Sequence, residues 1–154
     1  MKRRNHNPHH HLRTGLGMPA VWLDGKACAA DLEEKLKQRI SFCKTQPHLA
    51  VIIVGDDPAS HVYVSNKILC CERLGIKSTQ IKLPTETKQT ELEDILKGLN
   101  EDTTLHGILI QSPLPSHLDE GLLTDLIEPT KDVDGFHPVN LGKIVQGRLN
   151  GMIP

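Results

Sequence analysis

The sequence predicts an α/β fold, a domain of three α-β-α layers in which helices cover both faces of a mostly parallel sheet. Two kinds of segment predict it. The runs Leu49–Val54 and Leu105–Ile110 are short, largely apolar and rich in β-branched residues, as is typical of strands buried on both faces. The segments between them carry apolar residues at three- and four-residue intervals, the period of an amphipathic helix. Strands that alternate with helices imply right-handed crossovers and parallel pairing.

The first half of the chain is expected to run helix, strand, helix, strand. The first helix follows Asp24 and leads into the first strand. Pro58 and Ser60 open the second helix and Gly75 ends it, because proline suits the first helical turn and glycine the left-handed cap. A shorter strand follows at 79–83. The inward faces of the two helices are expected to carry Ala29, Leu32, Leu36, Ile40 and Cys43, and Val64, Ile68 and Cys71.

The second half is expected to add a helix, a strand, a helix and then a loop. Thr90 and Glu93 have the spacing of a capping box, which predicts the start of a helix. After the strand that ends at Ile110, a further helix is expected over 119–128, and Pro129 stops it. Beyond Pro129 the periodicity disappears and Gly, Pro and Asn dominate, which predicts a loop or connector. The inward residues would be Leu92, Ile95, Leu96 and Leu99, and Leu122, Leu123, Leu126 and Ile127.

Composition and charge exclude two classes of function. A chain of 154 residues with 38% hydrophobic and 24% charged residues is typical of one globular domain. No apolar run approaches the roughly 20 residues that span a bilayer, so we expect no membrane role. Residues 18–154 hold 14 basic and 19 acidic residues, a formal charge of −5. That charge, together with an aromatic content of only 3%, argues against a nucleic-acid partner.

Residues 1–17 are expected to lie outside the fold. The stretch is basic, rich in histidine and without periodicity, which is typical of a tag, an upstream extension or a misassigned start, and Met18 is a natural beginning. A mitochondrial leader is an alternative, because the stretch is Arg-rich and acid-free, although it is short and not amphipathic. The four cysteines form no C-x-x-C pair, so we expect reduced thiols, no metal site and a cytoplasmic protein.

Polar residues follow two of the predicted strands where each strand ends. Strand 49–54 leads through Gly55 to the helix that carries Tyr63, and strand 105–110 ends at Gln111. Ligands of open parallel sheets bind beyond the carboxyl ends of the strands. The topology therefore predicts that both segments reach one edge of the sheet, and that this edge is the binding site.

Tyr63 and Lys67 are spaced four residues apart, so they share a helix face. Lys67 stands beside the predicted core residue Ile68, at the border of the apolar stripe. A lysine that is partly desolvated there could act as a base near neutral pH. The alternative is that Lys67 is an ordinary solvated lysine and Tyr63 a packing residue.

Gln111, Asp132 and Asp134 complete the polar set. Gln111 follows a buried strand, so its amide needs partners, which a ligand or the nearby backbone can supply. Asp132 and Asp134 flank one residue before a glycine turn, and an aspartate can accept two N–H bonds from an amino-pyrimidine edge. At that spacing at most one of them faces a ligand, and capping of the loop is the alternative for either.

The pair Tyr63 and Lys67 also has the spacing of the catalytic pair of short-chain dehydrogenases. Those enzymes need a glycine-rich turn after their first strand. The turn that starts at Gly55 and ends at Pro58 does not match it, so we reject this interpretation.

Four ordered motifs resemble the bifunctional methylenetetrahydrofolate dehydrogenase/methenyltetrahydrofolate cyclohydrolase family. They are V-G-D-D-P-A-S at 54–60, Y-V-x-x-K at 63–67, G-I-L-I-Q-S-P-L-P at 107–115 and K-D-V-D-G-F-H-P-V-N at 131–140. The resemblance runs from about Met18 to Pro154, and the order and spacing of the motifs make it specific.

The resemblance implies oxidation of 5,10-methylene-tetrahydrofolate by NADP and hydrolysis of the methenyl product to 10-formyl-tetrahydrofolate. It implies that Lys67 is the catalytic lysine, that Gln111 supports it, that Tyr63 stacks on the folate and that Asp134 rather than Asp132 anchors the pterin. The residues that it implies for substrate binding are Tyr63, Val64, Lys67, Ile110, Gln111, Ser112, Pro113 and Asp134.

The chain departs from the family in two ways. Ser112 stands where many members carry leucine, and the chain ends at Pro154, about where the family's second, Rossmann-type domain for NADP begins. We therefore expect a catalytic domain over 18–145, the start of a connector at 146–154, no cofactor-binding residues and no hydride transfer by this chain alone. Full-length members are homodimers through contacts mostly in that second domain, so this chain is not expected to share them. The alternative function is a non-catalytic fragment that binds folate at best, with an exposed apolar face.

Overall fold

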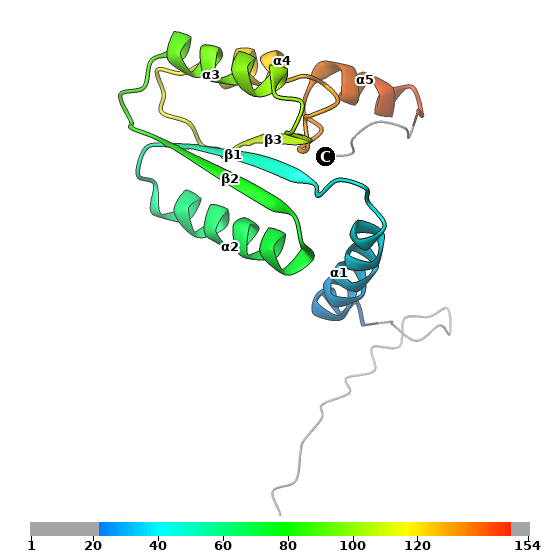
Figure 1. The fold of residues 1–154 in the computed structure, drawn as a ribbon. Helices are drawn as coiled ribbons and strands as arrows, with labels where there is room; N and C mark the ends of the chain where they lie inside the picture. Colours follow the sequence, from blue (N-terminus) through cyan, green and yellow to red (C-terminus); the bar gives the residue numbers. More distant parts are fainter. Residues whose placement is uncertain (1–21, 149–154) are drawn as a thin grey trace, which may run out of the picture.

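The computed structural model describes residues 22–148 and shows an α/β domain with a parallel sheet between two helical layers (Figure 1). The predicted leader 1–17 and residues 149–154 of the predicted connector lie outside the described residues. The strands lie in the order β2-β1-β3. The elements are α1 (Gly25–Ser41), β1 (His48–Val54), α2 (Pro58–Leu74), β2 (Lys77–Leu83), α3 (Gln89–Glu101), β3 (Gly107–Ile110), α4 (Glu120–Leu126) and α5 (Pro138–Val145).

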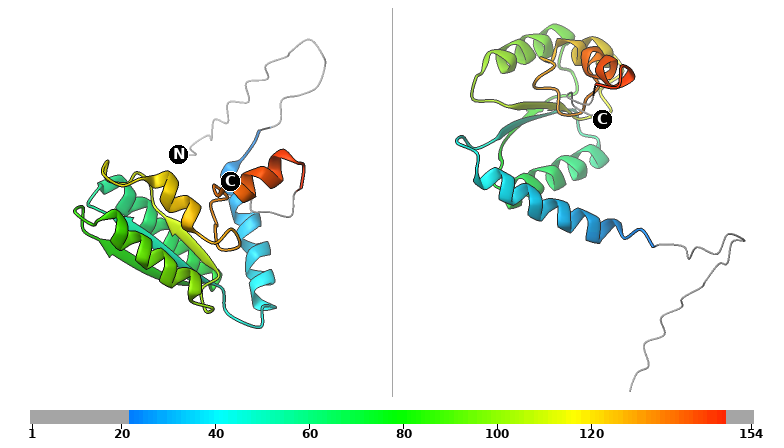
Figure 2. Two further views of the ribbon diagram at one scale, coloured as in Figure 1. Left: turned by 90° about the horizontal axis from the view of Figure 1, so that it is seen from above. Right: turned by 90° about the vertical axis from the view of Figure 1, so that its right-hand side faces the viewer.

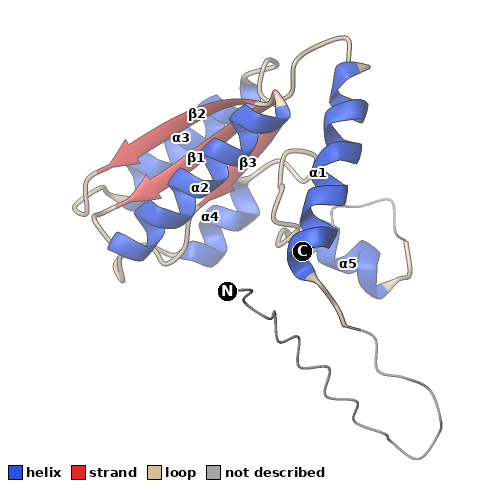
Figure 3. Ribbon diagram, turned by 90° about the horizontal axis from the view of Figure 1, so that it is seen from below, coloured by secondary structure: helices blue, strands red, loops and turns tan. Residues whose placement is uncertain are grey.

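The central strand β1 is buried on both faces, as the apolar run predicts. Because side chains alternate along a strand, Ile52 and Val54 enter the core formed with α3 and α4, while Val51 and Ile53 enter the core formed with α2. Both neighbouring strands pair with β1 in parallel, and the arrows of β1 and β2 point the same way in Figure 3. The prediction of a three-layer α/β domain is therefore confirmed.

Helix α2 forms where its end signals predict it. Asp57 caps its first turn by accepting a hydrogen bond from the Ser60 backbone N–H at 2.7 Å, and Pro58 occupies the first helical position. Gly75 ends the helix with φ 78°, the left-handed conformation that glycine adopts at little cost. Its core face carries Val64 and Cys71, both buried. The ends of α2, and hence the direction in which Lys67 leaves it, follow from short-range sequence signals.

Four expectations from the sequence need correction. Leu122, expected on the inward face of the helix over 119–128, is 55% exposed, because Leu123 takes the core position of α4. There is no capping box at Thr90, because α3 already begins at Gln89 after a Lys88 N-cap that makes no side-chain bond. The segment after Pro129 is not all loop: α5 starts at Pro138, where proline suits the first turn, and its early Asn140 is buried. The predicted inward face of α1 is at most half-buried, and Leu32 remains 55% exposed. The helix lies at the margin of the layered body (Figure 2).

One buried carboxylate organises the loop before α5, and the backbone of the same residue ties this loop to the sheet. Asp132, which is 2% exposed, accepts hydrogen bonds from the Gly135 N–H at 3.0 Å, the His137 N–H at 2.9 Å and the Asn140 amide at 3.0 Å. It also forms a parallel bridge with Ile108 of β3. The Asp132 carboxylate is therefore the one that caps the loop, and it has no capacity left for a ligand.

No helix among the residues that the structure describes is long and apolar enough to cross a membrane.

At the amino ends of the strands, two histidines extend the pairing of β1 with β3. The His106 N–H donates to the His48 carbonyl at 2.9 Å, and the His48 N–H donates to His106 Nδ1 at 3.1 Å. The His48 ring lies 2.8 Å from the Thr79 hydroxyl. Burial, followed by the nearby Lys77 ammonium, lowers the pKa of His48 below its ordinary value of 6.5, while Asp102 acts in the opposite direction.

Replacing Asp132 by alanine is expected to lower the free energy of unfolding by about 2–4 kcal/mol, because three donors in a buried loop lose their acceptor. Urea denaturation of the native chain and the variant measures the change. Asp94→Ala, which removes an exposed carboxylate on α3, is the control and should cost less than about 0.5 kcal/mol. A loss for Asp132→Ala as small as that of the control would contradict the assigned role.

Acidification through pH 6.5 is expected to destabilise the fold. The unfolded chain takes up a proton on His48 near pH 6.5, whereas the folded chain resists it, so stability falls as the pH decreases. Urea denaturation at pH 8 and pH 5.5 should show a smaller loss for His48→Gln than for the native chain. Thr45→Ala, which alters an exposed residue at the same end of the sheet and removes no titratable group, should keep the native pH dependence. Equal slopes for all three proteins would refute the prediction.

Candidate active site

The carboxyl edge of the sheet brings together the two segments that topology predicts to meet there. Lys67 on α2 donates a hydrogen bond from Nζ to Gln111 Oε1 at 3.1 Å, across 44 positions of sequence. Lys67 is half-buried, and Gln111 is 9% exposed. Gln111 leaves the sheet just after β3, and its backbone N–H still bonds the Ile52 carbonyl of β1 at 2.8 Å. The lysine–amide pair is therefore built on the central strand.

The Gln111 amide has partners on both of its ends. Its oxygen accepts from Lys67, and its nitrogen donates to the Ser112 carbonyl at 2.6 Å. The nearby backbone therefore satisfies only the nitrogen of this amide, and the oxygen has a side-chain partner. Beyond it, the Ser112–Pro113 peptide bond is cis, and both residues are exposed.

Asp134 lies close enough to Lys67 for the two charges to interact. Desolvation raises the pKa of this half-buried carboxyl, the Lys67 ammonium lowers it, and Asp132 raises it further. Because Asp132 points into the loop and is satisfied there, Asp134 is the aspartate with capacity left for a ligand. The third predicted segment therefore reaches the same region as Lys67.

The remaining predicted site residues fall into two groups. Tyr63 is 59% exposed, one helical turn before Lys67, so its ring is free to pack against a flat ligand. Val64 is fully buried between α2 and the sheet, where its side chain packs in the core and cannot touch a ligand. Ile110 is half-buried and packs against the α3–α4 core.

One buried polar residue at the start of α2 was not singled out by the sequence analysis. Ser60, in the first turn of α2, is 2% exposed, and its hydroxyl has no hydrogen-bond partner among the described residues. A buried hydroxyl without a partner is rare in proteins. The sequence offered only a helix-opening signal at this position, because burial of a hydroxyl cannot be seen in a residue pattern.

The described residues do not fit a dinucleotide. A pyrophosphate needs a glycine-rich turn and free N–H groups at a helix N-terminus. After β1, the Asp57 carboxylate already accepts the Ser60 N–H at the start of α2. The space beside Gly55, which has φ 83°, is also filled, because a Cβ at this position would lie 3.1 Å from the Thr85 hydroxyl oxygen. Residues 22–148 likewise hold no group of three His, Cys, Asp or Glu side chains placed for a metal ion.

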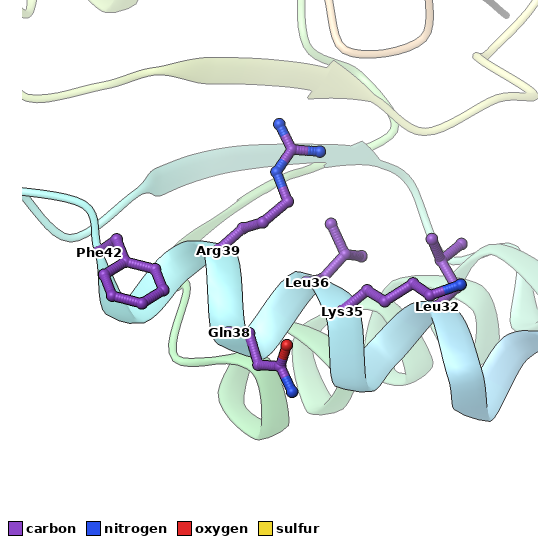
Figure 4. Close-up of a pocket in the computed structure, with 6 residues that line it drawn as sticks. All are labelled: Leu32, Lys35, Leu36, Gln38, Arg39 and Phe42. Carbon is purple, nitrogen blue, oxygen red and sulfur yellow. The ribbon is translucent and has the colours of Figure 1, made fainter.

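Two hollows in the surface lie away from these residues. One, of about 420 Å³, lies along α1 (Figure 4). The other, of about 280 Å³, lies at the amino ends of the strands. Their lining residues are Leu32, Lys35, Leu36, Gln38, Arg39 and Phe42 for the first, and Thr45, Gln46, His48, Lys77, Thr103, Thr104 and His106 for the second. Neither is lined by a residue of the carboxyl edge.

The groups at the carboxyl edge are suited to acid–base chemistry on a flat, nitrogen-rich ligand. An exposed aromatic ring can stack on it, and a half-buried carboxyl can accept its N–H groups. A lysine held by an amide can exchange a proton with the ligand or with water. The groups come from three segments of the chain, which are α2, the end of β3 and the loop before α5, as is typical of a site at the end of a parallel sheet.

Comparison with known proteins gives consistent matches. The model of the family "Tetrahydrofolate dehydrogenase/cyclohydrolase, catalytic domain" matches residues 23–134. Proteins named bifunctional protein FolD from Prosthecochloris aestuarii and Anaplasma phagocytophilum are 51% and 52% identical over 132 and 136 residues, which are 83% and 86% of this chain. Each match covers 45% of the relative, so the chain spans about half the length of the curated relatives it matches.

Solved structures agree. A bifunctional FolD methylenetetrahydrofolate dehydrogenase/cyclohydrolase from Campylobacter jejuni has a TM-score of 0.83 at 45% identity, covering 85% of this chain and 48% of that one. A 5,10-methylenetetrahydrofolate dehydrogenase from the silkworm Bombyx mori has a TM-score of 0.82 at 38% identity, covering 85% and 46%. The match of the family model over most of the chain decides the assignment. The chain belongs to the tetrahydrofolate dehydrogenase/cyclohydrolase family, and its described residues form that family's catalytic-domain fold.

Proposed function

We propose that the carboxyl edge of the sheet binds a tetrahydrofolate and that Lys67 is its acid–base residue. The observation that carries the proposal is the 3.1 Å hydrogen bond between Lys67 Nζ and Gln111 Oε1. It supports the pairing because an amide oxygen that accepts from the lysine fixes the direction of the amine. Tyr63 would stack on the folate, and Asp134 would accept N–H groups of its pterin.

The reaction that these groups suit is hydrolysis of 5,10-methenyl-tetrahydrofolate to 10-formyl-tetrahydrofolate. The methenyl carbon is part of an electrophilic amidinium, so a water molecule can attack it once a base removes a proton from the water. Lys67 in its amine form would accept that proton. Gln111 would steady both the lysine and the tetrahedral adduct, and the burial of Gln111 beside the half-buried Lys67 strengthens these polar contacts.

Oxidation of 5,10-methylene-tetrahydrofolate by NADP is proposed only for a protein that also contains a nucleotide site. A FolD structure from Trypanosoma brucei is described as complexed with NADP cofactor and an inhibitor, and this chain covers 48% of it. The residues described here do not fit a dinucleotide, so no step of hydride transfer is assigned to them. We further propose residues 18–145 as the catalytic domain of a cytoplasmic enzyme.

Lys67→Ala is expected to abolish cyclohydrolase activity of the chain. Loss of the methenyl-tetrahydrofolate absorbance, measured with purified protein, should slow by about 10²–10⁴-fold to the uncatalysed rate, because the base is removed. Lys97→Ala removes an exposed lysine of α3 and should leave the rate unchanged. An unchanged rate in Lys67→Ala would sink the catalytic proposal.

Binding of a folate analogue is expected to weaken as the pH falls. Desolvation raises the pKa of Asp134, so this carboxylate becomes protonated, and loses its ability to accept two N–H bonds, at a higher pH than an ordinary aspartate. Calorimetric titration at a series of pH values from 7.5 downwards should show the loss. Asp134→Asn should bind more weakly at pH 7.5 and vary less with pH. The same pH dependence in the native chain and in Asp134→Asn would exclude Asp134 as the anchor.

A second candidate is a folate-binding module without catalysis. The observation that favours it is the exposed apolar surface of α1, where Leu32 is 55% and Phe42 is 87% exposed. An unpartnered apolar surface is typical of a face that another part of a protein covers. Calorimetric binding of the analogue combined with a methenyl hydrolysis rate no faster than the uncatalysed one would select this candidate.

A further inference from the structure

We propose that Glu120 and the Ser112 hydroxyl are positioning residues for Gln111. In this proposal, the Glu120 carboxylate holds the Ser112 hydroxyl, and the Ser112 main chain in turn fixes the orientation of the amide that faces Lys67. The value of this arrangement for folate chemistry rests on the proposed function. The arrangement itself rests on contacts within the chain.

Three hydrogen bonds in series connect α2 to α4. Lys67 Nζ donates to Gln111 Oε1 at 3.1 Å, and Gln111 Nε2 donates to the Ser112 carbonyl at 2.6 Å. The Ser112 hydroxyl then donates to Glu120 Oε1. The series thus runs from the proposed acid–base residue, through its supporting amide, to a carboxylate that no part of the proposed reaction uses.

The Ser112 carbonyl selects one of the two orientations of the Gln111 amide. With the amide reversed, its NH₂ group would meet the Lys67 amine, and its oxygen would meet the Ser112 carbonyl, so both contacts would be lost. The position of Ser112 therefore decides whether an oxygen faces Lys67. Ser112 itself is exposed, so packing alone does not fix it.

Glu120 lies on an anchored element. It is in the first turn of α4, whose Asp119 N-cap accepts the Leu122 N–H at 3.0 Å. The Asp119 N–H donates to Gln89 Oε1 at 2.9 Å, which ties the start of α4 to the start of α3. The carboxylate is therefore presented from a fixed point.

The test measures how fast the side-chain amide protons of Gln111 exchange with water, by NMR of the full 154-residue chain. The resonances are assigned by their loss in Gln111→Glu. Glu120→Ala is expected to speed the exchange by about threefold, the effect of removing one exposed charge-assisted hydrogen bond. Glu120→Gln keeps an acceptor oxygen for the Ser112 hydroxyl and should show the native exchange rate. A carboxylate that acted only through the stability of the fold would not require this restoration.

Glu91→Ala is the matched control, because Glu91 is likewise an exposed acid in the first turn of a helix, α3. It should leave the exchange of the Gln111 amide unchanged. Should Glu120→Ala fail to fold, Ser112→Ala removes the same contact from its other end and should give the same acceleration. Native exchange in Glu120→Ala or in Ser112→Ala, or equal acceleration in Glu91→Ala, would overturn the proposal.

Calorimetric titration with the folate analogue separates this inference from the proposed function. If Glu120→Ala accelerates amide exchange and also weakens binding, both stand. If the native chain does not bind the analogue, the proposed function fails, while the exchange data still decide whether Glu120 positions Gln111.

Discussion

The burial of β1 on both faces is the constraint on which the rest of the structure depends. Successive residues of this strand enter two separate cores, one with α2 and one with α3 and α4. A strand in that position must have a neighbour on each edge, since every polar group of its backbone needs a partner. It must also have a helical layer on each face, since both faces are apolar. The polar groups of the candidate site are attached to it, through Gly55 on one side and through the Gln111–Ile52 hydrogen bond on the other.

Parallel pairing explains why residues far apart in sequence form one site. Because β1 and β3 run in the same direction, the segments that follow them leave at the same edge. Lys67 and Gln111 meet there, and the bridge between Ile108 and Asp132 brings the third segment to β3. Acid–base chemistry needs groups held within about 3 Å of one another. The sheet brings such groups together although they lie far apart in the sequence.

The sequence could predict those features that depend on short-range pattern. Both buried strands, the ends of α2 and the meeting of Lys67 with Gln111 follow from apolar runs, from proline and glycine signals and from strand direction. The sequence could not predict α5, because its eight residues include Gly142 and are too few for a clear helical period. Residue pattern alone could not separate Asp132 from Asp134, since both are aspartates on one turn. The family resemblance favoured Asp134, and the folded loop shows that Asp132 is filled. The Ser112–Glu120 contact depends on where α4 begins, which residue pattern locates only to within a few positions.

The segment 131–134 has a consequence for the evolution of the chain. Lys131 donates to three carbonyls at the end of α3, Asp132 binds the loop before α5, and Val133 packs so close to Gly107 that a Cβ there would lie 2.5 Å from its Cγ1. These successive residues are therefore tied in different directions, and the place of Asp134 is set by all of them together. An inserted or deleted residue here would break several ties at once, whereas length changes are tolerated at exposed loop tips. Variation in length among descendants of this sequence should accordingly be rare at 131–134.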